Sequence, residues 1–469
     1  MLQVLYYVAF AAILSLFLSW RKPSLVLRRA ALAGSLSTLG VSLLLGPLLL
    51  ERSLLLVPLS SWFGLPVLFG LDGVSYLFVL LSILLTLICV LVSWFSVLYL
   101  VREFLVCLVV LQFLLIVLFT AWDLLVFYVF FEAILIPMVL IIGVWGLREE
   151  KVRAAYYFFF YTFAGSVCFL IAILGIRDYA GTTDYLSLSC FNFPSQLEYW
   201  CFIGVFLGLA VKVPLFPFHI WLPQAHVEAP TAGSVMLAGV LLKVGGYGML
   251  RFCWPLFPVA TEYFSPCIML FSVLSMVYAG LVTCRQVDLK RIIAYSSVSH
   301  MGLVTASLFS QSITGLYSGV FLMLAHGLTS STLFILVGLL YARHKTRLVT
   351  NYRGLAGTMP LFSFAFLVSL LANCSLPGTS NFIGEFLSLY SVWNYSASVG
   401  VWSLIGAFLS VVYSVYLFNR TCFGSPAPSS SLVFGRDLSR LEFWVVTPLV
   451  LLNVLLGLFP WIALDFLSF

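Results

Sequence analysis

Six titratable side chains lie well inside stretches of the chain that are otherwise apolar. Two are lysines, two are histidines and two are glutamates. A charged side chain at the centre of a bilayer costs at least about 2.5–3.5 kcal/mol, so such residues face a protein interior or a wet cavity and usually have a function. The six residues are Glu132, Lys212, Lys243, His300, His326 and Glu385.

This mixture of amines, imidazoles and carboxylates is suited to relaying protons. Desolvation makes a buried lysine release its proton more readily, and a nearby carboxylate opposes that effect. Histidine titrates near neutral pH and can pass a proton on from either ring nitrogen. We therefore expect Glu132 to act as the movable partner of Lys212, and Lys243 to carry out the transfer step.

Taken singly, most of these residues also have a purely structural interpretation. Glu132 and Lys212 could form a static ion pair that holds helices together. Lys243 could extend its ammonium toward a helix end. His326 could be a packed core histidine, and His300 could lie at the membrane interface. The set of six is a far stronger signal than any one member.

The composition requires a membrane around these residues. The chain has 469 residues, 62% of them hydrophobic and only 9% charged, with a mean hydropathy of +1.13, whereas soluble domains carry roughly 25% charged residues. A spanning helix needs about 20 mostly apolar residues. Continuous apolar runs also argue against a β-barrel, whose strands alternate. We predict an all-α polytopic membrane protein with about fourteen transmembrane helices, at 2–19, 25–49, 74–98, 104–121, 123–146, 153–176, 199–226, 232–250, 265–284, 291–309, 313–341, 361–395, 397–419 and 441–466.

The positive charges are distributed unevenly between the two sides of this topology. Eighteen Lys and Arg fall on one set of loops, including those near 21–29, 148–153 and 343–353, and three fall on the other. We call the first side the charge-rich face. Lys and Arg concentrate on the cytoplasmic-type side of membrane proteins, so both termini are expected on the opposite side. The net charge of +6 follows from this topology and gives no support to nucleic-acid binding.

Two spans contain residues that break helices. Pro214 and Pro217 interrupt the seventh span, and Pro377–Gly378 interrupts the twelfth. Broken helices in corresponding positions of two halves point to the ion site of a transporter, although ordinary proline kinks are the alternative. We predict two inverted five-helix repeats, made of helices 4–8 and 9–13. The corresponding domains are 1–103 (helices 1–3), 104–250 (first repeat), 265–419 (second repeat) and 420–469 (loop and last helix).

Motifs for metals, nucleotides and redox groups are lacking. The ten cysteines include no CxxC pair, and no glycine-rich phosphate loop follows a strand. Cys190 and Cys201 flank one loop and could pair, but two free thiols are the favoured interpretation. His219, His226 and Glu228 make a zinc site conceivable without a convincing ligand set. We expect no cofactor and no metal in this chain.

Several segments resemble the antiporter-like, proton-translocating subunits of respiratory complex I (NADH:ubiquinone oxidoreductase). They are KVPLFPFHIWLPQAHVEAPTAGSVMLAGVLLKVGGYGMLR (212–251), DLLVFYVFFEAILIPM (123–138), DLKRIIAYSSVSHMG (288–302), AHGLTSSTLF (325–334) and NFIGEF (381–386). Two features favour the subunit 4 branch of this family. One is the sequence AHVEAP…GSVMLAGVLLK, and the other is Glu385, where the sister subunits carry lysine. The motifs cover about residues 123–386.

The resemblance implies a function for each of the six residues. Glu132 and Lys212 match the glutamate–lysine pair of that family, and Lys243 matches its central lysine. His300 and His326 match the histidines of the hydrophilic axis. Glu385 matches the terminal proton-exchange carboxylate. The implied fold has fourteen helices with two inverted five-helix repeats.

The same resemblance implies an assembly and a membrane. Sister subunits 2 and 5 would be neighbours, and NADH, FMN, iron–sulfur clusters and ubiquinone would belong to other subunits. The chain itself would contain no redox centre while being part of an NADH:ubiquinone reductase. The expected location is the mitochondrial inner membrane, with both termini on the intermembrane-space side, or alternatively a bacterial plasma membrane. Two further functions remain open: a subunit of a multi-subunit cation/proton antiporter, and a non-conducting membrane scaffold.

Overall fold

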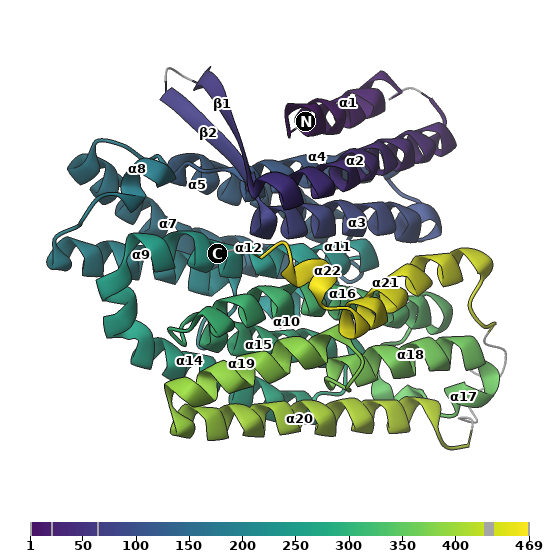
Figure 1. Ribbon diagram of the computed structural model, residues 1–469. Helices are drawn as coiled ribbons and strands as arrows, with labels where there is room; N and C mark the ends of the chain where they lie inside the picture. Colours follow the sequence, from purple (N-terminus) through teal and green to yellow (C-terminus); the bar gives the residue numbers. More distant parts are fainter. Residues whose placement is uncertain (1, 20–21, 63–64, 426–435, 468–469) are drawn as a thin grey trace.

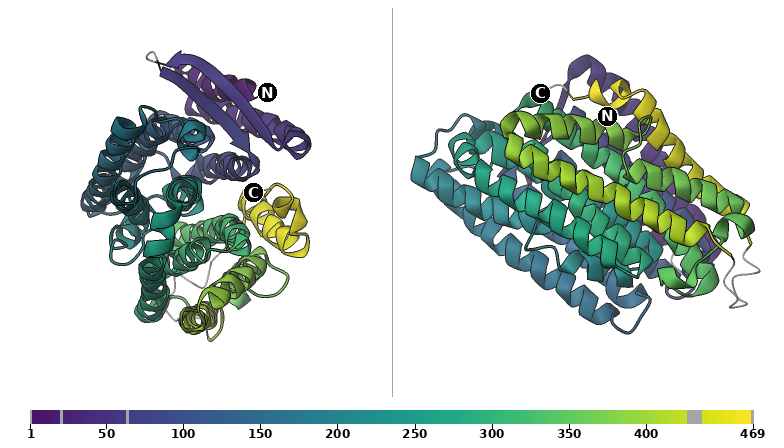
Figure 2. Two further views of the ribbon diagram at one scale, coloured as in Figure 1. Left: turned by 60° about the vertical axis from the view of Figure 1, so that its left-hand side comes forward. Right: turned by 90° about the horizontal axis from the view of Figure 1, so that it is seen from below.

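Long helices that run roughly parallel to one another make up most of the molecule (Figures 1 and 2). The computed structural model describes residues 2–19, 22–62, 65–425 and 436–467. The first half contains α1 Leu2–Leu18, α2 Ser24–Arg52, β1 Leu54–Trp62, β2 Leu65–Asp72, α3 Gly73–Ser96, α4 Val101–Thr120, α5 Leu124–Ala133, α6 Leu135–Trp145, α7 Lys151–Ala180, α8 Tyr185–Ser189, α9 Ser195–Lys212, α10 Trp221–Glu228, α11 Thr231–Met236, η1 Leu237–Leu241, α12 Leu242–Gly248, η2 Met249–Cys253 and α13 Trp254–Leu256. The second half contains α14 Pro258–Arg285, α15 Leu289–Leu308, α16 Ile313–His344, η3 Val349–Asn351, α17 Leu355–Thr358, α18 Pro360–Asn373, α19 Ser380–Tyr395, α20 Ala397–Cys422, α21 Arg440–Leu458 and α22 Trp461–Leu464.

Helical structure occupies each of the fourteen predicted spans. Within the described residues, ten helices are long and apolar enough to cross a membrane by length and composition alone. Four predicted spans do not meet that criterion, each for a visible reason. The first, α1, has 17 residues; two others are the broken spans; and α15 is polar because it carries basic, serine and histidine residues. The polytopic helical fold is confirmed, while the count of fourteen crossings stays a prediction.

One element escaped the sequence analysis, which predicted helices only. Between α2 and α3 the chain forms an antiparallel pair of strands, β1 and β2, in register from Leu54↔Asp72 to Leu59↔Val67, with a shift of register before Trp62↔Leu65. Figure 1 shows this hairpin projecting beside α1 and α2. The segment is as apolar as a membrane span, so hydropathy did not distinguish it. The predicted loop at 420–440 lies partly outside the described residues, because 426–435 are not described.

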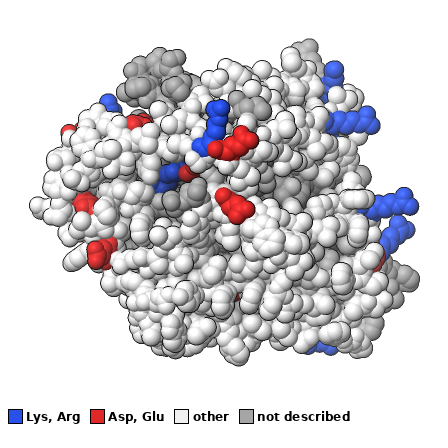
Figure 3. All heavy atoms as spheres, in the orientation of Figure 1, with Lys and Arg blue, Asp and Glu red and all other residues white. Residues whose placement is uncertain are grey.

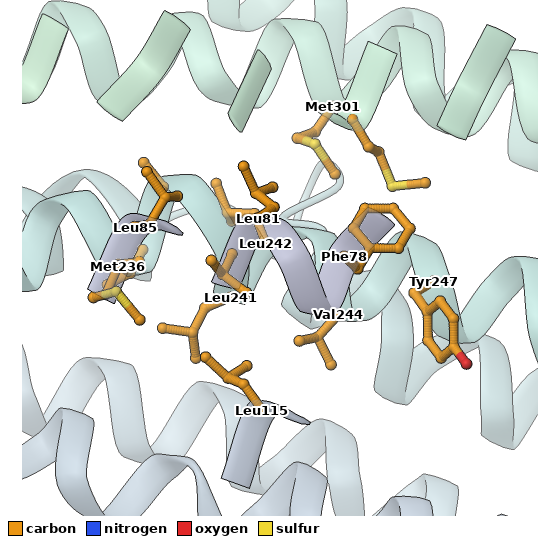
Figure 4. Packing of buried hydrophobic residues seen from close by; sticks show 14 of the residues in the cluster. Phe78, Leu81, Leu85, Leu115, Met236, Leu241, Leu242, Val244, Tyr247 and Met301 are labelled. Atoms are coloured by element: carbon orange, nitrogen blue, oxygen red, sulfur yellow. The ribbon is translucent and has the colours of Figure 1, made fainter. Parts of the chain in front are cut away.

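Two helical segments form the centre of the molecule. The most apolar 18-residue windows of Thr231–Leu256 and of α16 are entirely buried, whereas those of α2, α20 and α21 are largely exposed. Figure 4 shows residues of α3, α4 and α15 packed around Leu241, Leu242 and Val244. Because the surrounding helices separate these two segments from lipid, they can carry polar residues that an outer helix could not.

Both predicted helix breaks are present. The first separates α9 from α10 over residues 213–220, and the second separates α18 from α19 over residues 374–379. A break inside a membrane leaves backbone groups that protein must satisfy. At the first break, Trp221 Nε1 donates to the Val211 carbonyl at 3.0 Å. At the second break, Ser380 Oγ donates to Asn453 Oδ1 of α21.

The two halves lie side by side when viewed nearly along the helices (Figure 2, left), with the blue and teal helices beside the green ones. The predicted domain boundaries and the inverted relation between the halves stay predictions. On the face shown in Figure 3, lysine and arginine dominate the right-hand edge, and most of the acidic residues lie to its left. That edge corresponds to the charge-rich face.

An ion pair ties the hairpin and α3 to the centre of the molecule. Asp72 ends β2, caps α3 by accepting from the Ser75 amide at 3.0 Å, and pairs with Arg251 of η2. The Arg251 guanidinium also lies over the rings of Trp122 and Tyr185, at 4.9 and 5.6 Å from their centroids. Burial alone would raise the pKa of Asp72, but Arg251 and hydrogen bonds with Ser75 hold that pKa below its usual value.

We expect Arg251→Gln to loosen the hairpin. Removing one partner of a fully buried ion pair costs about 3–5 kcal/mol, and because the Asp72 side chain is partly exposed we expect a smaller loss here. Amide hydrogen exchange in β1 and β2 should therefore become faster in the variant, while Arg52→Gln at the exposed end of α2 should leave it unchanged.

The effect also has a definite pH dependence. The pKa of Asp72 is lower in the folded protein than in the unfolded chain. The carboxylate therefore adds its full stabilisation to the fold above the unfolded pKa of about 3.9, and this stabilisation is lost as the pH falls through the folded pKa. In Arg251→Gln, burial without the guanidinium instead raises the pKa of Asp72, so the difference between the two proteins should be largest near neutral pH and should shrink as the variant's carboxyl takes up a proton at lower pH. Equal exchange rates in the two proteins at neutral pH would contradict this interpretation.

Candidate functional site

Four of the six predicted residues form one continuous series through the centre of the molecule. The Lys243 ammonium lies 3.0 Å from His326 Nδ1. The rings of His326 and His300 are 5.5 Å apart between centroids. His300 Nδ1 lies 2.9 Å from Glu385 Oε1. All four side chains are almost completely buried.

Lys243 begins this series on an unusual stretch of helix. The preceding segment η1 is π-helical, and α12 follows it. The Lys243 ammonium turns back and donates to the Ala238 carbonyl within η1. A π-helical turn is rare, occurs frequently at functional sites, and leaves a carbonyl able to accept this bond. Sequence reasoning treated Lys243 as isolated, and the structure provides it with two partners.

The hydrogen bonds of the two histidines indicate which ring nitrogens face each other across the series. If Nδ1 of His326 accepts from Lys243, its Nε2 carries the proton and is a donor; this nitrogen is buried without a hydrogen-bond partner. His300 Nε2 is also buried without a partner, and the two rings are neighbours. Two unpaired buried ring nitrogens in adjacent histidines form a site where a water molecule would be satisfied.

Glu385 ends the series beside a small cavity. This residue lies one turn into α19, after the second helix break. Its contact with His300 is close but poorly aligned, since Oε1 lacks a hydrogen bond of good geometry; catalytic contacts of this kind often tighten only in the working complex. A cavity of about 10 Å³, close to the smallest volume that holds one water molecule, touches Glu385, His300 and Ser299. The alternative interpretation of His300 as an interfacial residue is not supported, because the ring is buried in the middle of α15.

Glu132 and Lys212 form a second, separate group. Lys212 is the last residue of α9, directly before the first break, and its ammonium donates to the Phe131 carbonyl at 3.3 Å while lying 4.1 Å from the centre of the Phe131 ring. Glu132 is not within the 4.0 Å that defines an ion pair, and its Oε1 is buried without a hydrogen-bond partner. The structure thus places the two charges near each other but apart.

Between the two groups, no side-chain hydrogen bond connects the described residues. Gly245 of α12 lies against Val213 and the Leu209 carbonyl of α9, so the helices that carry Lys212 and Lys243 touch. The contact surface there is apolar. A proton passing from Lys212 to Lys243 would therefore require water in that interface.

A further buried cluster lies toward the charge-rich face, and the sequence analysis missed it. Three carbonyls at the end of α10 would lack helical partners. Arg347 donates to the Val227 carbonyl, the Leu147 amide donates to the Glu228 carbonyl at 2.9 Å, and Lys290 donates to the Ala229 carbonyl at 2.8 Å. These three hydrogen bonds fix the C-terminal end of α10, the part of the broken span that follows the first break.

Two of these cations were counted among the loop charges of the charge-rich face. Lys290 and Arg347 are in fact buried, at 0 % and 1 % exposure. Arg347 also lies 3.7 Å from Glu228, and Lys290 lies 3.5 Å from Ser234 Oγ. Sequence hydropathy could not reveal this, because both residues stand among charged neighbours.

The remaining histidines and cysteines fit no metal site. His226 stacks on Phe334 with ring centroids 4.5 Å apart, and His219 packs edge-to-face against Tyr278. Across the described ranges, no three His, Cys, Asp or Glu lie close enough to hold a metal ion. Cys190 and Cys201 are both free, with Cys190 exposed and Cys201 buried, which confirms the interpretation as unpaired thiols.

Comparison with known proteins places this arrangement in a family. Residues 121–411, which include all six site residues, match the family described as NADH:quinone oxidoreductase/Mrp antiporter, TM. The chain belongs to this family. The antiporter-like membrane fold and the expected resemblance are thereby confirmed.

Relatives of this antiporter-like chain extend over almost its full length. It is 50% identical over 473 residues to NADH-ubiquinone oxidoreductase chain 4 of Metridium senile, covering 99% of this chain and 96% of that one. It is also 50% identical over 396 residues to the same chain of Marchantia polymorpha, covering 84% and 80%. The expected subunit 4 branch is confirmed by these relatives.

Solved structures share the fold of this antiporter-like chain. A chain of respiratory complex I from Thermus thermophilus with bound NADH superposes with a TM-score of 0.87 at 31% identity, covering 98% of this chain and 97% of that one. A chain of the Mrp complex from Dietzia sp. DQ12-45-1b superposes with a TM-score of 0.89 at 18% identity, covering 99% and 96%. The second likeness concerns the fold alone.

We expect Lys243→Met to leave the stability of the folded chain unchanged or to raise it. Methionine has a similar shape, and replacing a buried charge with an apolar side chain is often neutral or stabilising. Leu242→Ala, at the neighbouring and equally buried position, should lower stability by about 2–5 kcal/mol. Thermal unfolding of the purified, assembled protein measures both; an equal loss in Lys243→Met would show that Lys243 is there for structure.

Proposed function

We propose that this chain is a proton-translocating membrane-arm subunit of respiratory complex I. The observation that carries the proposal is the series from Lys243 through His326 and His300 to Glu385, in which the two histidine rings are neighbours without a direct hydrogen bond. Such a series of titratable groups has no structural purpose that apolar residues would not serve better. It is the chemistry that proton relay needs.

The path begins, in this proposal, at the charge-rich face. A cavity of about 180 Å³ lined by Glu150, Arg153, Gln224, Glu228 and Arg291 reaches the end of α10. From Glu228 the buried Lys290 and His226 lead inward toward Lys243. Protons would then pass along the series to Glu385 and leave through the small cavity beside it.

Lys212 supplies the switch in this proposal. Energy released by electron transfer in other subunits would change the separation of Glu132 from Lys212. Moving the carboxylate away makes the buried ammonium give up its proton more readily. Because Lys212 is the last residue before the break, a small movement of the break displaces its side chain.

The assembly and location follow from the same proposal. Sister subunits 2 and 5 would adjoin this chain, and NADH, FMN, iron–sulfur clusters and ubiquinone would lie in partner subunits, with no cofactor here. The chain would lie in the mitochondrial inner membrane with both termini on the intermembrane-space side. The chain 4 relatives support this environment.

Glu385→Gln tests the path in the whole complex. The amide keeps the size and the polar contact of Glu385 but cannot carry the proton, and general acid–base groups contribute about 10²–10⁴-fold to proton transfer. Proton uptake by sealed vesicles during NADH oxidation should therefore fall at least about ten-fold. Glu149→Gln, at an exposed carboxylate near the charge-rich face, is the matched control and should pump normally. Pumping at the wild-type rate in Glu385→Gln would refute the relay.

Purification separates the proposal from the antiporter and scaffold alternatives. If the chain belongs to complex I, subunits that oxidise NADH should accompany an affinity-tagged copy in stoichiometric amount. A complex that exchanges cations for protons without any NADH-oxidising subunit would favour the antiporter. Loss of assembly in Lys243→Met, with no separate loss of pumping, would favour the scaffold.

A further inference from the structure

A sizeable cavity lies away from the relay. It opens at the charge-rich end of the molecule between α3, α6, α11 and α16, and its volume is about 560 Å³. Ordinary ligand pockets measure about 300–1,000 Å³. None of the six relay residues lines this cavity, so the proton path does not explain it.

The inner walls of the cavity are apolar. Val92 of α3, Val144 of α6, and Ile335 and Leu339 of α16 form them. No acidic residue is among the lining residues that the structure describes. Water is poorly satisfied in such a space, whereas a hydrocarbon chain fits it.

Aromatic residues with polar ends form the mouth. Tyr99, Trp145 and Tyr341 lie there, and Trp145 Nε1 donates to the Tyr99 carbonyl at 2.9 Å, which fixes two sides of the rim. Tyrosine and tryptophan concentrate at the level of lipid headgroups. The mouth therefore lies at the membrane interface and the apolar interior lies below it.

One cation lies at this mouth, and two more contact the backbone of residues in its walls. Lys345, the exposed residue that ends α16, lines it directly. Lys151 donates to the carbonyl of the wall residue Val144 at 2.7 Å. Arg28 of α2 donates to the carbonyl of the wall residue Val97 at 2.9 Å. Each of these cations retains further N–H donors, so the rim can bind an anionic oxygen group.

We propose that this cavity binds an anionic phospholipid. One acyl chain would fill the apolar interior, and the phosphate would lie between Lys345, Lys151 and Arg28. The positive rim above an apolar pocket matches the charge and shape of such a lipid, and a neutral lipid would leave the rim unpaired. This site is independent of the proton path and goes beyond the function proposed above.

The position of the site suggests what the lipid does. The cavity touches Pro230 and Thr231, where the helix leading to Lys243 begins, and it touches α16, which carries His326. A bound lipid would therefore join the two buried central helices to α3 and α6. Bound lipid should accordingly raise the thermal stability of the complex, because a ligand that binds the native state stabilises it.

The test uses the intact complex stripped of lipid in neutral detergent. Phosphatidylglycerol and phosphatidylcholine with identical acyl chains are added in turn, and the lipid retained is measured by mass spectrometry. We expect phosphatidylglycerol to be retained and to raise the unfolding temperature. Each lysine removed, in Lys345→Gln and in Lys151→Gln, should weaken its binding about five-fold, as expected for a basic residue at an anionic surface. Lys22→Gln, an exposed lysine on the same face, should have no effect.

A second variant tests the cavity itself. Ala342 lies at the mouth and is exposed, so Ala342→Trp should close the opening without disturbing the core and should abolish retention. Equal retention of the two lipids, indifference to the two lysine substitutions, or unchanged retention in Ala342→Trp would each overturn the proposal. So would density for a protein segment of a neighbouring subunit inside the cavity of the whole complex.

Discussion

The burial of the Lys243 ammonium is the constraint on which the rest of the structure depends. An amine at this depth must be shielded from lipid and given acceptors, or it will not remain there. The fold meets both needs. It encloses the most apolar 18 residues of the helix 231–256 and of α16, and it supplies the Ala238 carbonyl through a π-helical turn and His326 from α16. His300 and Glu385 then extend the same series, so the needs of one buried lysine account for the placement of four titratable side chains.

The two helix breaks have different roles in placing the titratable side chains. The first break ends α9 at Lys212 and leaves α10 held at its far end by Arg347, Lys290 and the Leu147 amide. The break thus lies between a segment fixed at its far end and the residue proposed as the switch. The second break begins the segment that carries Glu385, and α19 packs against α15, α16, α20 and α21, which holds the terminal carboxylate firmly.

The sequence alone singled out the six candidate residues, because an ionisable side chain inside an apolar run is conspicuous. It was also sufficient for the breaks, since proline has a direct mechanical effect on a helix. Three features of the structure were not predicted from the sequence. The hairpin 54–72 is as apolar as a span, so hydropathy concealed it. Lys290 and Arg347 stand among other charges, so their burial left no local signal. The π-helical turn before Lys243 depends on packing against α3 and α16 rather than on the residues of the turn.

Water-resolved density of the assembled complex tests the central claim most directly. The account predicts an ordered water between the unpaired Nε2 atoms of His326 and His300, so that Lys243, the two histidines and Glu385 form one hydrogen-bonded chain. It also predicts water between α9 and α12 in at least one state of the working complex, because Lys212 must exchange with Lys243. A dry gap between the two histidines in every state, at a resolution that shows waters elsewhere in the same helices, would contradict the account.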